Sequence, residues 1–241
     1  MTRPEEKLVD PHAEDPMPGL VSFIAGGNFV SPAYYISTTI KTLVGFDVYG
    51  WAGEKVNGDW EAVAKAAGAA GNLSRFNSAY AESINTQWQQ TAGATWHGHA
   101  ADSSQTYFTH LAACVEFQVR PLEEIERQLT NISTGMRELG RRVGDFLQDI
   151  SDLALLWLAS QAAEAVLASS LVGAPAAAAQ AAVSAAYLVQ IVAKVGELIK
   201  LVTTAYKAIY GMIGLLNALS SQTTPENLPA LPNSTYDHPG V

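Results

Sequence analysis

The chain has 241 residues, of which 48% are hydrophobic and 15% are charged, a length that allows one or two domains with a substantial core. The formal net charge of −9 argues against a nucleic-acid partner, because phosphate binding requires clustered lysines and arginines. The single cysteine, Cys114, excludes an intramolecular disulfide and a zinc site built from several cysteines.

The N-terminal part divides into an acidic arm and a set of short helices. Residues 1–18 contain five acidic residues and four prolines, which is typical of a disordered arm and unlike a secretory signal peptide. Residues 19–57 form the next predicted region, and its glycine-rich start predicts an irregular segment. The pair Ser31-Pro32 then predicts a helix over 32–44, since serine caps helices and proline suits the first helical position. A further short helix is predicted over 46–55.

A first long helix is predicted from residue 60 to about 91. Asp59 precedes it and is suited to cap its free N–H groups. Apolar residues recur every three or four positions, as in an amphipathic helix. They are Trp60, Val63, Ala67, Phe76, Tyr80, Ile84 and Trp88.

A second long helix is predicted shortly after Gly98. Its apolar seam alternates steps of three and four residues, which is the pattern of coiled-coil packing. The seam residues that we expect to bind a partner are Leu111, Val115, Leu122, Ile125, Leu129, Ile132, Met136, Leu139, Val143 and Phe146, and the pattern continues to Trp157. Proline cannot continue a helix without losing a hydrogen bond, so we expect a kink or a break at Arg120-Pro121 within the region 58–152.

The region 153–220 is almost free of charge, and Gly173-Ala174-Pro175 predicts a turn between two apolar helices. Such helices must be buried in something. Burial against the coiled-coil helix or in an oligomer is the preferred interpretation, and insertion into a membrane is the alternative. The proline-rich residues 221–241 are predicted to be a disordered tail.

The tripeptide Trp96-His97-Gly98 lies in the gap between the two long helices. A helical hairpin with this turn resembles the W-x-G family of small helical proteins that are exported by type VII (ESX) secretion systems of actinobacteria. The longer helical continuation resembles the N-terminal regions of actinobacterial W-x-G toxins. The resemblance covers roughly residues 46–150, and it implies that Trp96 and Gly98 hold the hairpin turn. The family's Tyr-x-x-x-Asp/Glu export signal is absent, since none of the nine tyrosines has an acidic residue four positions later.

Two groups of residues could suggest a chemical site, and both have a plainer interpretation. His97, His99, His110 and Cys114 lie within 18 residues, but a metal site needs three or four converging ligands, so these are interpreted as polar surface residues. The acids Glu123, Glu124, Glu126 and Asp145 fall off the apolar seam and are interpreted as a solvated helix face. No nucleotide-binding, nucleophile-elbow or His-Glu-x-x-His motif occurs. The sequence therefore predicts no enzyme, no cofactor and no metal.

The resulting prediction is an all-α, elongated protein: an antiparallel W-x-G hairpin, an extended coiled-coil-like helix and a second apolar hairpin. Its expected function is helix packing with another W-x-G-like protein or with a copy of itself. The resemblance implies contact with the secretion machinery and export without a signal peptide, from the cytoplasm to the cell surface or medium. The alternatives are a membrane-active or pore-forming protein that inserts residues 153–219, and a self-assembling scaffold protein.

Overall fold

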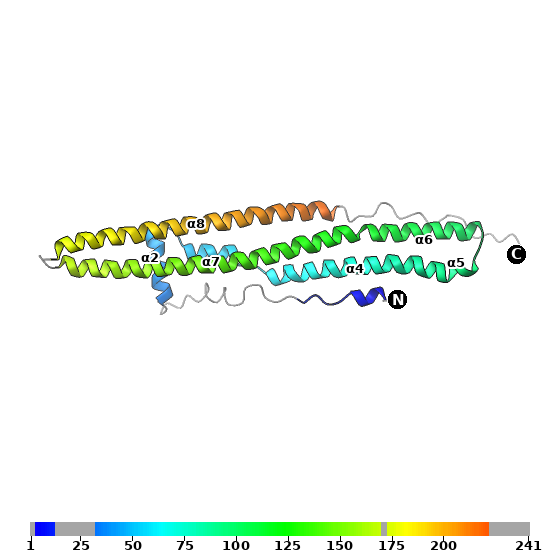
Figure 1. Cartoon of the computed structure of the whole chain (residues 1–241), viewed down its shortest axis with the longest axis horizontal. Helices are drawn as coiled ribbons and strands as arrows, with labels where there is room; N and C mark the ends of the chain where they lie inside the picture. Colours follow the sequence, from blue (N-terminus) through cyan, green and yellow to red (C-terminus); the bar gives the residue numbers. More distant parts are fainter. Residues whose placement is uncertain (1–2, 13–31, 170–172, 222–241) are drawn as a thin grey trace. The chain divides into compact units, whose positions relative to one another are not determined.

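The computed structural model describes residues 3–12, 32–169 and 173–221, and every regular element within them is a helix. This result confirms the all-α prediction. Figure 1 shows the helices in chain order, with the short helices followed by long ones. They are η1 (Pro4–Lys7), α2 (Pro32–Val44), α3 (Val48–Val56), α4 (Trp60–Gln90), α5 (Ala92–Thr95), α6 (His99–Phe117), α7 (Val119–Ala168) and α8 (Ala174–Ser220). All of the predicted irregular segment 19–29 and all of the predicted tail except residue 221 lie outside the described residues.

The chain divides into two compact units that share the long helices. Unit 1 comprises Met1–Ala13, Ala62–Asn131 and Met212–Val241, and therefore holds most of α4, α5, α6 and the start of α7. Unit 2 comprises Glu14–Glu61 and Ile132–Gly211, and holds α2, α3 and most of α7 and α8.

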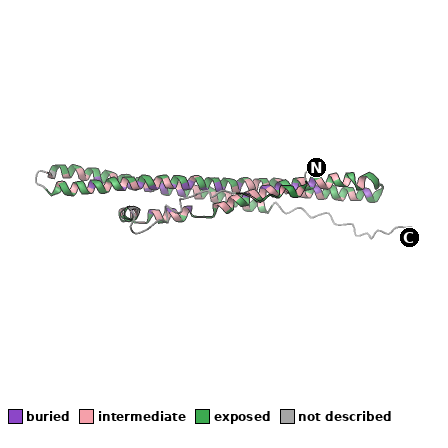
Figure 2. Ribbon diagram, turned by 90° about the horizontal axis from the view of Figure 1, so that it is seen from below, coloured by how far each residue is buried: buried purple, intermediate pink, exposed green. Residues whose placement is uncertain are grey.

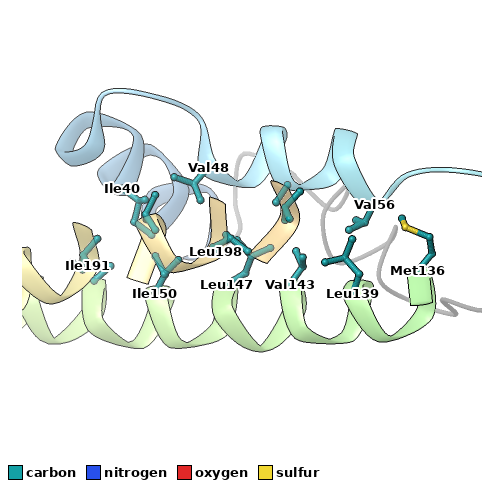
Figure 3. Packing of buried hydrophobic residues seen from close by; sticks show 14 residues of the cluster. Ile40, Val48, Val56, Met136, Leu139, Val143, Leu147, Ile150, Ile191 and Leu198 are labelled. Atoms are coloured by element: carbon teal, nitrogen blue, oxygen red, sulfur yellow. The ribbon is translucent and has the colours of Figure 1, made fainter. Parts of the chain in front are cut away.

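Unit 2 contains the main hydrophobic core. Within this unit α7 and α8 run antiparallel, and α2 and α3 cover one side of the pair (Figure 3). The fully buried apolar side chains converge from all four helices, and burying each large one contributes about 1.5–3 kcal/mol. The cluster consists of Ile40, Val48, Ala52, Val56, Met136, Leu139, Val143, Leu147, Ile150, Ala154, Ile191, Val195, Leu198 and Val202.

Helix α3 is fixed at its start and on its flank. The Asp47 carboxylate accepts a hydrogen bond of 2.9 Å from the backbone N–H of Gly50, so α3 begins at Val48 with a capped first turn. Tyr49 donates a hydrogen bond of 3.3 Å from its hydroxyl to the carbonyl of Leu147, and the same hydroxyl is bonded to the hydroxyl of Ser151. These bonds attach α3 to α7.

Replacing Tyr49 with phenylalanine should reduce the stability of unit 2 by about 1 kcal/mol, the usual contribution of a partly buried hydrogen bond. Burial of the hydroxyl raises the pKa of Tyr49 above its usual value of 10.0. The folded state therefore holds this proton more tightly than the unfolded state, so this contribution is complete below the ordinary tyrosine pKa and is lost as the pH rises through the folded-state pKa.

Urea unfolding between pH 7 and pH 11 measures both effects. The alkaline loss of stability should be smaller in Tyr49→Phe than in the wild type. The exposed Tyr35 provides the control, because Tyr35→Phe should leave the midpoint at pH 7 unchanged. An alkaline limb unchanged by Tyr49→Phe would show that this hydroxyl is not desolvated.

Unit 1 is built on α4, which runs antiparallel to α6 and the start of α7. Three hydrogen bonds establish this pairing: Trp88 Nε1 to Ser104 Oγ (3.0 Å), Asn77 Nδ2 to Gln118 Oε1 (3.1 Å), and Ser74 Oγ to the carbonyl of Val119 (3.3 Å). As the residue number falls along α4, the partner's number rises, so the two segments lie side by side in opposite directions (Figure 1).

Residues 3–12 also pack on α4, although their composition predicts a disordered arm. The Asn72 amide donates to the carbonyl of Val9, and Gly68 leaves room for Pro11, since a Cβ at Gly68 would lie 2.9 Å from the Cβ of Pro11. Small and amide-bearing residues on α4 therefore create a docking position for a segment that has few apolar side chains of its own. The remaining residues of the predicted arm lie outside the described part of the chain.

The helix after the W-x-G motif breaks at Gln118 rather than at Arg120-Pro121. Helix α6 ends at Phe117, and the N–H of Leu122 donates to the carbonyl of Gln118 (3.2 Å), so α7 is already helical where the break was expected. Pro121 has no N–H to offer the carbonyl four residues earlier, which belongs to Phe117. The missing bond therefore ends the helix at that carbonyl, and Pro121 sits in the first turn of α7.

Candidate interaction surfaces

The W-x-G motif forms the joint between α5 and α6. Gly98 precedes α6 with φ +99° and ψ 179°, a backbone conformation that is essentially restricted to glycine. A Cβ at this position would meet no atom within 4 Å, so the backbone conformation, and not packing space, is what requires glycine. Trp96 follows α5 and is 44% exposed, so its ring is available on the surface and does not bury the end of the hairpin.

A surface depression lies beside this joint. Its lining includes Trp88, Gly93, Trp96, His97 and Asp102, all from unit 1. His97 is exposed, and no group of three or more His, Cys, Asp or Glu side chains suited to a metal ion occurs among the described residues. His110 and Cys114 do approach each other, with 3.8 Å between Nδ1 and Sγ. The depression therefore presents two tryptophans beside polar side chains at the joint.

The interior of the α4–α6 hairpin consists of small and polar residues. Within Ala62–Asn131, the fully buried apolar residues are Pro121 and four alanines: Ala67, Ala81, Ala101 and Ala112. Gly71, Ser74 and Asn77 share the buried side of α4. Large apolar residues of the same hairpin remain exposed, namely Leu73, Tyr80, Phe108 and Phe117, the last of them at 57%.

The structure buries the predicted apolar side of α4 only in part. Of the seven apolar residues that predicted this helix, Ala67 is buried, Tyr80 is exposed and the other five are half-buried. The fully buried stripe follows Ala67, Gly71, Ser74, Asn77 and Ala81, which also have steps of three and four. This spacing of small residues is the signal in the sequence that could have located the helix–helix contact.

The predicted interaction seam is divided between the two units. Leu111, Val115, Leu122, Ile125 and Leu129 are half-buried in unit 1. Ile132, Met136, Leu139 and Val143 are buried in unit 2, and Phe146 packs against that core. The second group is thus covered by the chain's own helices, so the expectation of an exposed seam there is corrected. The physical reason is that α2 and α3 occupy the position that a partner would take.

The acidic residues near the start of α7 belong to ion pairs on its surface. Glu124 accepts hydrogen bonds from Arg127 (2.9 and 2.5 Å) and from Gln128 (2.6 Å), and these donors lower its pKa. Glu126 lies 4.0 Å from Arg75 of α4. A carboxylate held in its charged form by arginine is a poor proton donor or acceptor near neutral pH.

The outer faces of α7 and α8 in unit 2 leave large apolar side chains exposed, among them Leu155, Val166 and Val189. Two helical stretches, His99–Ala168 and Pro175–Ser220, each contain a segment long and apolar enough to cross a membrane. The core helix of a water-soluble protein passes the same test but is mostly buried, whereas only 17% and 11% of these segments is buried. Their apolar surface is therefore not covered by the rest of the chain.

Comparison with known proteins gives no relative. No protein-family model matches the chain, and no curated protein or solved structure shows significant similarity to it.

Proposed function

We propose that this protein is a non-enzymatic helical interaction protein whose α4–α6 hairpin packs against helices of a second protein chain. The observation that carries the proposal is that the fully buried apolar residues of the hairpin are Pro121 and four alanines, while its large apolar residues are half-buried or exposed. Burying a Leu, Phe or Met side chain contributes about 1.5–3 kcal/mol, whereas the methyl group of alanine contributes about 0.8 kcal/mol. Two helices joined by such small contacts gain little stability from each other.

A partner would cover the large apolar residues that the hairpin leaves exposed. Leu73 and Tyr80 lie seven residues apart, two turns of α4, and the half-buried Phe76 stacks on Tyr80 with 5.7 Å between ring centroids. Residues spaced in this way make an apolar stripe that fits the groove of another helical pair. A second antiparallel hairpin, from a W-x-G-like protein or from another copy, would complete a four-helix arrangement.

Because the sequence resembles the W-x-G family, we propose that this association takes part in type VII secretion. Gly98 with its positive φ supports a specific role for the motif's glycine, and the exposed ring of Trp96 supports a recognition role for its tryptophan. The chain would associate with its partner in the cytoplasm and then be exported as a folded helical complex. Because the Tyr-x-x-x-Asp/Glu signal is absent from this sequence, the partner would supply it.

The test is secretion of the epitope-tagged full chain by an actinobacterial host that has a type VII system. The chain should reach the medium from this host and remain inside a matched strain in which that system is inactivated. Co-expression of a W-x-G partner carrying the export signal should increase export. Retention in the cells of both strains, with and without the partner, would contradict the proposal.

A further inference from the structure

Residues 153–168 of α7 and 174–193 of α8 form an apolar helical pair near the end of unit 2 where α7 stops and α8 begins. This segment contains one charged residue, Glu164. Residues 174–193 of α8 make 20 helical residues, about 30 Å at 1.5 Å per residue, which equals the hydrocarbon thickness of a bilayer. The α7 side, from 153 to 168, is about 24 Å long by the same rise.

The two helices present apolar side chains all around their circumference, apart from the one stripe where they touch. On α8, the half-buried and buried residues follow a single stripe through Ala177, Ala181, Ser184 and Ile191, and the positions off this stripe are exposed. Among the described residues of 153–193, only Ser169 and Gln190 are both polar and exposed. The exposed bulky residues are Leu155, Leu156, Leu158, Val166, Val183, Val189 and Val192. Figure 2 shows many exposed residues (green) along the long helices.

The contact between the helices has the features of packing in an apolar medium. Ser160 donates to the carbonyl of Trp157 (2.7 Å), and its hydroxyl is also bonded to that of Ser184 on the opposite helix (2.7 Å). No buried side-chain nitrogen or oxygen among the described residues lacks a hydrogen-bond partner. Small residues that approach closely and hydroxyls bonded across the interface are common in membrane helix pairs.

Both helices carry charged residues next to the end of the apolar segment that lies away from the turn. Asp149 of α7 forms an ion pair with Lys194 of α8 (3.0 Å), and Asp152, Glu197 and Lys200 follow within two turns. Beyond this group, towards the ends of the two helices, the charged residue is Glu164, about 6 Å from the end of α7 by helical rise. That position allows its carboxylate to reach the far interface of a bilayer.

We infer that residues 153–168 of α7 and 174–193 of α8 insert into a lipid bilayer as an antiparallel helical pair, with the Asp149–Lys194 pair at the entry interface. A second copy of the chain would cover one stripe of each helix and leave the remaining apolar faces in water, whereas lipid chains cover every face. The inference concerns unit 2 and does not rest on the proposed function, which concerns the hairpin of unit 1. The inserting segment is also shorter than the stretch 153–219 that the sequence suggested. It ends at residue 193, because Lys200 and Lys207 place charges on the later part of α8.

The test uses phosphatidylcholine vesicles and an environment-sensitive fluorophore on single cysteines. In the full chain with Cys114→Ser, Val189→Cys places the label on the inserting segment, and Tyr210→Cys places it on α8 beyond the charged residues. These two sites are matched, since Val189 is 69% exposed and Tyr210 is 67% exposed. Vesicles should shift the emission at 189 to shorter wavelength and make it sensitive to quenchers in the lipid chains, while the emission at 210 stays unchanged.

Charge substitutions provide the second measurement. Val183→Asp should lower the fraction that floats with vesicles at least about tenfold, because residue 183 lies near the middle of the inserting part of α8 and a carboxylate at the bilayer centre is strongly disfavoured, and Tyr210→Asp should not. Absence of flotation together with an unchanged emission at 189 would overturn the inference. An emission shift at 189 that occurs without vesicles and follows dimer formation in light scattering would also overturn it, in favour of a second copy. Failure of export in the secretion test would leave both measurements unaffected.

Discussion

Replacing Leu147 with alanine will lower the free energy of unfolding of unit 2 by about 2–5 kcal/mol, the range for a buried leucine that leaves a cavity. Leu147 is fully buried on α7, in the cluster that includes Ile40 of α2, Val48 of α3 and Leu198 of α8. Its removal therefore weakens contacts to the other three helices at once. Urea unfolding followed by circular dichroism, without lipid or detergent, measures the loss.

The control is the same substitution, leucine to alanine, at an exposed position of the same helix. Leu156 is 49% exposed and lies two to three turns further along α7, so Leu156→Ala should change the stability in water by no more than about 0.5 kcal/mol. Equal losses from Leu147→Ala and Leu156→Ala would mean that the outer face of α7 is covered in solution. That result would contradict both the core described for unit 2 and the exposed surface beyond it.

Replacing Gly98 with alanine will destabilise the joint between α5 and α6 by about 1–3 kcal/mol, the usual cost of a residue held in a glycine-only conformation. Space is not the cause, because nothing lies within 4 Å of the added Cβ. Gly98→Val should act in the same direction with a larger effect, and both should reduce export. His97→Ala should be nearly silent, since the His97 side chain is exposed. Thermal unfolding and the secretion assay give the two readouts.

Gly135 is the matched control for the added methyl group. A Cβ added there would also meet open space, but Gly135 lies within α7, where alanine is favoured over glycine by up to about 1 kcal/mol. Gly135→Ala should therefore be neutral or stabilising. If the Gly98 and Gly135 variants behave alike, the positive φ at Gly98 does not hold the joint, and the motif has no special structural role.

Local features follow well from the sequence where a single residue determines them. The helix predicted over 32–44 coincides with α2 (Pro32–Val44), because proline at the first position sets where it begins. Pro121 predicts a nearby break, although the break falls at Gln118, since the lost bond concerns the carbonyl four residues before the proline. Such effects act within one turn and need no knowledge of the rest of the chain.

The tertiary partners of each helix could not be predicted in the same way. The period of the seam on α7 indicates that one side is buried, but it carries no information on whether another chain or α2 and α3 would cover Met136 and Val143. On α4, the large apolar residues suggest one contact face, whereas the buried side of the helix carries Gly71 and Ala81. Small residues allow close packing but carry little hydrophobic signal, so hydrophobic periodicity does not reveal their stripe.

Hydrogen–deuterium exchange of the monomeric full chain tests the central claim, which is that the hairpin of unit 1 lacks a core of its own until a partner covers it. Without a partner, backbone amides in α4 and α6 should exchange rapidly, while those of α7 between residues 136 and 150 should be strongly protected by the core of unit 2. Protection of α4 and α6 equal to that of α7 in the isolated monomer would contradict the claim, because the hairpin would then be stable without another chain.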